Sequence, residues 1–232
     1  MHHEKHIRGI GSYIKDIVYG GNDGIITTFA VVAGTIGASL DPTITLILGF
    51  SNLLADGFSM AASNFLGSRS ENQLYDEEEQ REYQEIETIP DHERQEIRQI
   101  FQDEGYDPND TENLVQLVSK NKKFWVDFMM RYELGLHRDG AGREFTAATL
   151  TFVAFVIAGS LPLIPFLLFN SAVTSLPISI AATAIALFLI GSLRVLITKK
   201  NAIVSGLEML IVGGIAATMA YVIGYLVSQI VG

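Results

Sequence analysis

Long apolar runs alternate with one strongly polar block along this chain of 232 residues. From Phe145 to Leu193, 49 consecutive residues include no Asp, Glu, Lys or Arg. Because a helix that crosses a bilayer needs roughly 20 apolar residues, this run is long enough for two membrane spans. The polar residues and the proline between Asn170 and Pro177 suit the turn between those two spans.

The same pattern over the whole chain predicts an all-α polytopic membrane protein with five transmembrane helices. The spans are expected at about residues 17–38, 43–66, 146–169, 178–197 and 202–230. Pro162 and Pro165 are expected to kink the third span, because proline removes a backbone donor and crowds the preceding turn. The predicted organisation is a tail with two spans in residues 1–68, an insert in residues 69–144 and three spans in residues 145–232.

The polar insert carries the whole net charge of the protein, which is −10. It holds 20 Asp and Glu against 10 Lys and Arg, whereas the other residues hold 6 of each sign. The pattern predicts three helices: residues 71–88, residues 92–104 after an Asp91 cap, and a stretch from an Asp110 cap to about Gly135. An acidic insert would repel phosphates, so nucleic-acid binding is not expected. The chain contains no cysteine, which excludes disulfides and thiolate metal sites.

The positions of lysine and arginine predict how the chain is oriented in the membrane. Basic residues occur before the first span, in the insert and at the end of the fourth span, whereas the loops at 39–42 and 170–177 contain none. Because basic loops stay on the cytoplasmic side, the N-terminus and the insert are expected in the cytoplasm and the C-terminus outside. His2, His3 and His6 lie in the N-terminal tail, where contact with metal and a role as plain tail residues both remain open.

Two pairs of glutamates in the insert have the spacing of a shared helix face. Glu82 and Glu85 are three residues apart, as are Glu93 and Glu96, so each pair lies on one side of its helix. Two such helices joined by a tight turn could present four carboxylates to one cavity, where a divalent cation would offset their repulsion. The alternative is a solvated acidic face, because glutamate is a good helix former.

Two methionines add softer candidate ligands to this set. Met129 and Met130 lie three or four residues before Glu133, so at least one sulfur shares its helix face. Thioethers are soft ligands and carboxylates suit harder ions, so a mixed set fits Fe²⁺, Mn²⁺, Co²⁺ or Zn²⁺ better than Ca²⁺ or Mg²⁺. The alternative is that the methionine pair packs in an apolar core.

Ionisable groups inside the predicted spans are candidates for a transport path. A charged side chain at the centre of a bilayer costs ~2.5–3.5 kcal/mol on insertion scales, so it is rarely there without a role. Asp23 is flanked by glycines in the first span, and Met60 lies among small residues that permit close helix contact in the second. Together they predict a minimal path for a soft metal ion. Asp56 and Glu208 are candidate proton-coupling groups, or alternatively helix-end groups near water.

These features together resemble the vacuolar iron transporter family over nearly the whole chain. The likeness rests on Asn22-Asp23-Gly24, on Ser59-Met60-Ala61, and on residues 129–136 together with the Glu-rich helices. The resemblance implies a homodimer with five transmembrane helices that exchanges cytosolic Fe²⁺ or Mn²⁺ for protons. It also implies that Asp23 and Met60 line the path. The implied ligands in the insert are Glu82, Glu85, Glu93, Glu96, Met129, Met130 and Glu133.

One position departs from the family's pattern. The family often has a glutamate shortly after the methionine of the second span, where this chain has Ser63 and Asn64. This leaves open how proton coupling and ion preference are set at that position. The short loops are typical of a bacterial protein, so a bacterial inner membrane is expected rather than an organelle membrane.

The sequence therefore predicts a divalent-metal transporter, not an enzyme, that exports Fe²⁺ or Mn²⁺ from the cytoplasm by proton antiport. No prosthetic group is expected, and the bound ions would be Fe²⁺, Mn²⁺, Co²⁺ or Zn²⁺. One alternative is a membrane-anchored metal sensor, which would need the ligands of the insert but not Asp23 or Met60. A ferritin-like ferroxidase is a weaker alternative, because such sites draw on paired Glu-x-x-His motifs and no Glu in this chain has a His three residues on.

Overall fold

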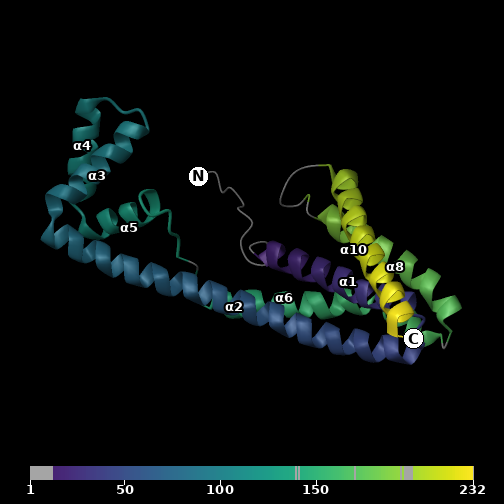
Figure 1. The fold of residues 1–232 in the computed structure, drawn as a ribbon. Coiled ribbons are helices and arrows are strands. Elements are labelled where there is room, and N and C mark those ends of the chain that lie inside the picture. The colour runs from purple at the N-terminus through teal and green to yellow at the C-terminus, as the bar shows by residue number, and fades with distance from the viewer. Residues whose placement is uncertain are drawn as a thin grey trace, which may run out of the picture. The chain divides into compact units, whose positions relative to one another are not determined.

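The computed structural model describes residues 13–138, 140, 142–169, 171–193, 195 and 201–231. The described residues form helices and connecting turns and contain no strand (Figure 1). The helices are α1 (Ile14–Gly37), α2 (Pro42–Thr88), α3 (Pro90–Asp103), α4 (Pro108–Ser119), α5 (Lys122–Tyr132), α6 (Arg143–Ser160), α7 (Ile164–Leu168), α8 (Ala172–Leu193) and α10 (Ala202–Val231). The N-terminal histidines, Arg194 and Lys199 lie outside the described residues.

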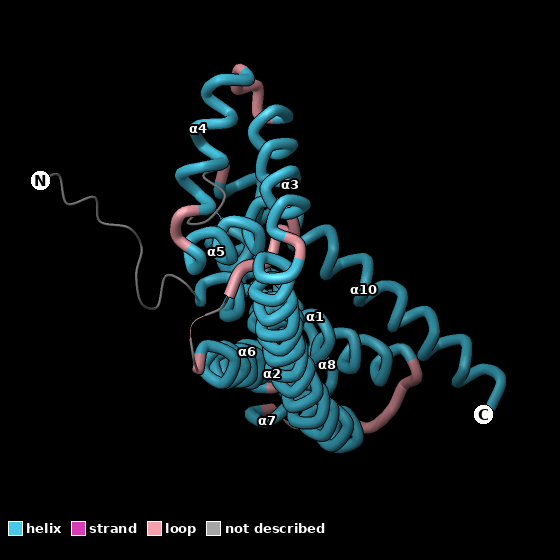
Figure 2. The backbone as a smooth tube through the Cα atoms, turned by 90° about the vertical axis from the view of Figure 1, so that its left-hand side faces the viewer, coloured by secondary structure: helices cyan, strands magenta, loops and turns pink. Residues whose placement is uncertain are grey.

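The chain divides into two compact units. The first combines Met1–Phe65 with Phe145–Gly232, and the second is Leu66–Glu144. The 47-residue helix α2 contributes its first half to one unit and its second half to the other. Figure 2 shows the described residues as helices joined by loops. The sequence pattern had suggested separate helices ending near residue 66 and starting near residue 71, whereas the helix is continuous through this stretch.

Three helices among the described residues are long and apolar enough to cross a membrane: α2, α8 and α10. α1 has the length, but Asn22, Asp23 and several glycines lower its mean hydropathy. α6 begins with the charged residues Arg143 and Glu144 and has only 18 residues. The chain is thus an all-helical protein with several apolar membrane-length helices, and the expected count of five spans stays a prediction.

Glycines allow the helices of the first unit to pack closely. A methyl group added at Gly24 of α1 would collide with the backbone carbonyl of Phe155 in α6. One added at Gly224 of α10 would likewise collide with the carbonyl of Gly34. Small residues at such contacts let two backbones approach, which drives helix association in lipid. An apolar core in the same unit is formed by Val32, Leu53, Phe155, Leu163 and Phe166.

The third predicted span is broken at its prolines. α6 ends at Ser160, and a turn separates it from the short helix α7, which has Pro165 in its first turn. Two buried serines of α8 donate hydrogen bonds to carbonyl groups in this broken segment. Ser179 Oγ donates to the carbonyl oxygen of Pro162 at 2.7 Å, and Ser175 Oγ donates to that of Pro165 at 3.1 Å. The expected kink is therefore an interruption of the helix, with hydroxyl donors from α8 at two of its carbonyl groups.

The second unit consists of the C-terminal part of α2 with α3, α4 and α5. Its apolar core consists of Tyr75, Ile86, Ile97, Val115, Val118, Trp125, Val126, Phe128, Met129 and Met130. An ion pair between Arg98 of α3 and Glu112 of α4, at 2.8 Å, ties two of its helices together.

The helix boundaries in this unit correct several expectations. Asp107, not Asp110, caps α4, because its side chain accepts hydrogen bonds from the backbone N–H groups of Asn109 and Asp110. Asp91 is not a cap either, because α3 already begins at Pro90. The stretch expected as a third helix is two helices, since the chain turns after Ser119 and Asn121 caps α5. Gly105 and Gly135 follow helix ends with positive φ, as expected of terminating glycines.

Candidate metal-binding site

The glutamates singled out in the insert come from three helices of the second unit. α2 carries Glu82 and Glu85, α3 carries Glu93 and Glu96, and Glu133 is the C-cap of α5. The turn between α2 and α3 is a single residue, Ile89, followed by Pro90, which can start a helix because its missing N–H is not needed there. This turn places the glutamates of α3 beside those of α2.

Three of these carboxylates form one compact group. One oxygen from each of Glu82, Glu85 and Glu93 lies within 4.8 Å of the other two. Glu82 is 3% exposed and Glu93 is 2% exposed, so two of the three are withdrawn from water. Within the described part of the chain, Oε2 of each of these two buried residues has no hydrogen-bond partner. Buried acceptors without donors are costly, and a cation bound between them would remove that cost.

The surroundings raise the pKa values of these carboxyl groups. The pKa of Glu82 is raised to about 8, first by burial and then by the charges of Glu133, Glu93, Glu85 and Glu96. The pKa of Glu93 is raised to about 7, first by burial and then by the charges of Glu96, Glu85 and Glu133. A hydrogen bond with Glu96 raises it further.

The carboxylate of Glu133 belongs electrostatically to the same cluster. Its residue is exposed overall, yet the pKa of its carboxyl is raised by desolvation and then by the charges of Glu96 and Glu85. All five glutamates therefore repel one another within a single region of the second unit. A bound divalent cation would reduce this repulsion among all five groups. Carboxylates on a solvated acidic face would need no such cation.

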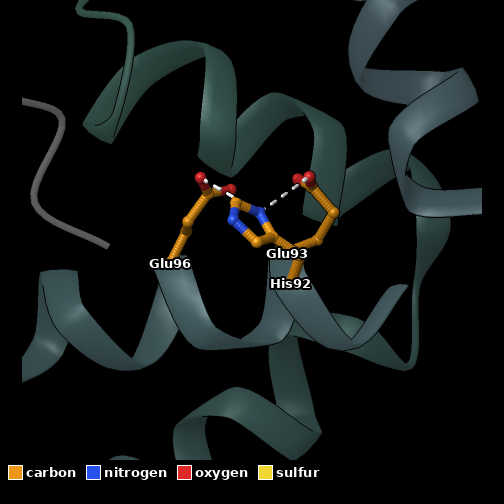
Figure 3. A group of neighbouring side chains, drawn as sticks. All are labelled: His92, Glu93 and Glu96. Carbon is orange, nitrogen blue, oxygen red and sulfur yellow. Dashed lines mark ion pairs between the residues drawn. The ribbon is translucent and has the colours of Figure 1, made fainter. Parts of the chain in front are cut away.

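A histidine that the sequence reasoning did not include lies at the edge of this group. Nδ1 of His92 is 3.4 Å from Oε1 of Glu96 and 4.0 Å from Oε1 of Glu93. Figure 3 shows its ring between these two carboxylates. The signal in the sequence is the spacing of His92 and Glu96, four residues apart and so on one helix face.

The two methionines lie in the apolar core of the second unit. Met129 and Met130 are both fully buried and pack in one cluster with Ile86 and Ile97. These isoleucines directly follow Glu85 and Glu96 in the chain. The observed packing fits the alternative that the pair is structural, and a ligand role for either sulfur stays a prediction.

Met60 of α2 lines a pocket in the first unit. The pocket has a volume of about 300 Å³. Its lining is Lys15, Asp16, Tyr19, Met60, Ser63, Asn64 and Thr151. Met60 also packs against the apolar core around Val32 and Phe155. The half-buried Asp23 is not among the residues that line this pocket, and in the described structure it lies within electrostatic range of Asp56. Glu208 is exposed on α10.

Asp16 is a second residue that the sequence reasoning missed. The side-chain amide of Asn64 donates to Oδ1 of Asp16 at 3.3 Å and to Oγ1 of Thr151 at 3.0 Å. The other oxygen, Oδ2 of Asp16, is buried without a hydrogen-bond partner among the described residues. Asp16 precedes Asp23 by seven residues, which puts both on one side of α1 and could have drawn attention to it. Asn64 lies in the stretch where the family often has glutamate, and its side-chain amide binds the carboxylate of Asp16.

Apolar membrane-length helices together with a buried carboxylate cluster define the class: a helical membrane protein with a candidate site for divalent cations. The sequence matches the VIT family over residues 14–225, and the chain belongs to that family. It is 33% identical to vacuolar iron transporter 1 of Arabidopsis thaliana over 98% of this chain and 91% of the relative. The vacuolar iron transporter of Plasmodium berghei is also 33% identical, over 97% of this chain and 85% of the relative.

Proposed function

We propose that this protein is a divalent transition-metal transporter that moves Fe²⁺ or Mn²⁺ out of the cytoplasm in exchange for protons. The observation that carries the proposal is the pair of buried carboxylates with unpartnered oxygens, Glu82 and Glu93, within a cluster of five glutamates. Membership of the VIT family and the iron-transporter names of its relatives support the transport function. In this proposal the metal ion is the cargo and no enzymatic activity is needed.

The carboxylate cluster would collect ions before transport. Glu82, Glu85 and Glu93 offer three oxygens at ligand spacing. Ionised carboxylates suit Mn²⁺ and Fe²⁺, and a sulfur from Met129 or Met130 would favour the softer ion if a small rearrangement turned it toward the cluster. Because Glu82 and Glu93 have pKa values near neutral pH, binding a metal ion there would release protons.

The path through the membrane would use Asp23 and Met60. Asp23 supplies a charge that a divalent ion and a proton can both occupy, and Met60 supplies a soft ligand on the next helix. Asp56, which lies within electrostatic range of Asp23, is a candidate for proton coupling. Glu208, exposed on the apolar helix α10, is a second candidate.

The placement of basic residues supports an orientation with the N-terminus and the insert in the cytoplasm. The cargo would then be collected from the cytoplasm, which gives the direction of export. We place the protein in a cell membrane as a homodimer, whereas the names of its relatives refer to the vacuole. The lipid bilayer, protons and divalent ions are its expected partners.

Uptake by sealed vesicles containing the purified protein tests this function. With the metal on the side of the insert and a higher proton concentration inside, wild type should accumulate Fe²⁺ and Mn²⁺. Asp23→Asn keeps the size and polarity of the side chain but removes its charge, so uptake should fall to background while metal binding by the detergent-solubilised protein persists. Uptake by neither protein, with binding in both, would favour the membrane-anchored sensor instead.

A further inference from the structure

His92 differs from the other candidate ligands in its chemistry. It is the second residue after Pro90 in the first turn of α3, and its side chain is 63% exposed. One ring nitrogen of His92 and one carboxylate oxygen from each of Glu93 and Glu96 all lie within 4.8 Å of one another. Figure 3 shows the three side chains converging from consecutive turns of one helix.

We propose that His92, Glu93 and Glu96 form a nitrogen-containing metal site that shares Glu93 with the all-carboxylate site of Glu82, Glu85 and Glu93. The inference rests on the proposed function only in that the cluster binds metal ions. The shared residue is the one that carries the structural argument: Glu93 is 2% exposed, and its Oε2 has no hydrogen-bond partner among the described residues. A bridging carboxylate uses both of its oxygens, one for each ion.

The donor sets of the two sites favour different ions. Three carboxylate oxygens suit hard ions and fit Mn²⁺ well. Replacing one oxygen by an imidazole nitrogen favours Fe²⁺, Co²⁺ and above all Zn²⁺, for which histidine is a common ligand. The cluster would therefore hold two ions with unequal preference: a harder ion between α2 and α3, and a more nitrogen-seeking ion at the exposed edge of α3.

An ordinary surface ion pair accounts for the geometry less well. An exposed pair of His and Glu at i and i+4 contributes little to the stability of a helix. Such a pair would involve Glu96 alone, whereas the ring also lies toward the buried Glu93. It would also leave Oε2 of Glu93 without a partner in its buried position. A cation at this site would bind the nitrogen and one oxygen from each carboxylate, and the second oxygen of Glu93 would bind the ion of the all-carboxylate site.

The test uses the full-length protein in detergent, with His2, His3 and His6 replaced by Gln so that the tail contributes no nitrogen ligand. His92→Gln is compared with His137→Gln, a matched change at an exposed histidine whose Nδ1 lies 3.3 Å from the carbonyl oxygen of Gly135. Calorimetry measures the affinities for Zn²⁺ and Mn²⁺. Pulsed electron paramagnetic resonance on the Mn²⁺-loaded protein detects nitrogen coupled to the ion.

His92→Gln should weaken the binding of Zn²⁺ at one site by about tenfold or more, leave the tighter Mn²⁺ site nearly unchanged, and abolish the nitrogen coupling. His137→Gln should change none of these. Unaltered nitrogen coupling in His92→Gln, equal losses for both metals, or the same effect in His137→Gln would overturn the proposal. A parent protein that binds no metal would overturn it as well.

Vesicle uptake separates this inference from the proposed function. If the parent shows the His92-dependent nitrogen coupling but moves no metal into vesicles, transport fails and the site stands. If the parent transports Fe²⁺ and His92→Gln retains both the Zn²⁺ affinity and the coupling, the site fails and transport stands.

Discussion

Glu82 and Glu93 make the stability of the second unit depend on pH. Buried among other carboxylates, they favour the protonated state, with pKa values of about 8 and about 7. In the unfolded chain the same groups have a pKa near the ordinary glutamate value of 4.5. Between these values the folded state binds more protons than the unfolded state, so stability without metal falls as pH rises.

We therefore expect the metal-free second unit to unfold at a higher temperature near pH 6 than near pH 8. The fluorescence of Trp125 reports this unit selectively, because it is the single tryptophan of the chain and is buried in the core of this unit. With saturating Mn²⁺ the order should reverse, since the deprotonated form binds the ion and ligand binding stabilises the folded state.

Glu82→Gln is the control for this prediction. The amide is nearly isosteric and has no charge, so the metal-free variant should melt higher than wild type near pH 8 and show a flatter pH dependence. Its stabilisation by Mn²⁺ should be smaller. A wild-type melting temperature that rises with pH in the absence of metal would contradict the assigned pKa values.

Asn64 offers a test in the first unit. Asn64→Leu keeps the approximate size of the side chain but removes the donor to Asp16 and Thr151. Leaving a partly buried carboxylate without its donor should cost about 1–3 kcal/mol. Heating the detergent-solubilised protein and measuring the fraction that still elutes as a folded species checks this. Asn64→Asp would not serve as a conservative variant, because it adds a like charge beside Asp16.

At the scale of elements, the N-terminus of α4 provides a direct comparison between two aspartates. Asp107 accepts two backbone hydrogen bonds as the N-cap, at 2.8 and 2.9 Å, whereas Asp110 lies inside the first turn. Asp107→Ala should therefore destabilise the second unit by about 1 kcal/mol, and Asp110→Ala by less. Chemical unfolding followed by Trp125 fluorescence measures both. An equal loss in the two variants would contradict the capping assignment.

The packing of α10 predicts opposite outcomes for two of its glycines. Gly224→Ala would drive a methyl group into the backbone of Gly34 on α1, whereas a methyl at Gly214 meets no described atom within 4 Å. Gly224→Ala should lower the temperature at which the detergent-solubilised protein aggregates. Gly214→Ala should leave it unchanged or raise it slightly, because alanine favours the helix. A similar loss in both variants would show that helix flexibility, not close contact, requires these glycines.

The elements illustrate which features sequence patterns could supply. The membrane-length helices were predicted from the length of the apolar runs. A distortion at Pro162 and Pro165 was predicted from the backbone donor that proline lacks. The choice of cap could not be predicted, because Asp107 and Asp110 are both good caps and only the path of the backbone selects between them. The continuity of α2 was also missed, since an apolar-to-polar transition changes the surroundings of a helix without ending it.

Some features of the candidate site could also be predicted from the sequence, and others could not. Spacing of three identified the pairs of Glu82 with Glu85 and Glu93 with Glu96. Burial of one member from each pair depends on how α3 packs on α2, which local spacing does not determine. The Glu-x-x-His pattern does not cover His92, because here the histidine comes first, one residue before Glu93 and four before Glu96.

At the scale of the whole molecule, orientation in the membrane decides whether the carboxylate cluster meets cytosolic metal. The insert should lie in the cytoplasm and the loop before α8 outside, because the loops at 39–42 and 170–177 contain no Lys or Arg whereas the insert contains ten. The chain contains no cysteine, so a single engineered thiol is the only one present. Asp110 and Val173 are both exposed and suit the substitution.

In cells that carry Val173→Cys, a membrane-impermeant thiol reagent should label the intact cells. In cells that carry Asp110→Cys, it should label only after the membrane is permeabilised. Both variants should first be shown to support metal transport, so that an altered fold does not account for the pattern. Labelling of Asp110→Cys but not of Val173→Cys in intact cells would reverse the orientation. The cluster would then face the exterior and collect ions for import, since the same buried carboxylates would meet metal from the opposite side.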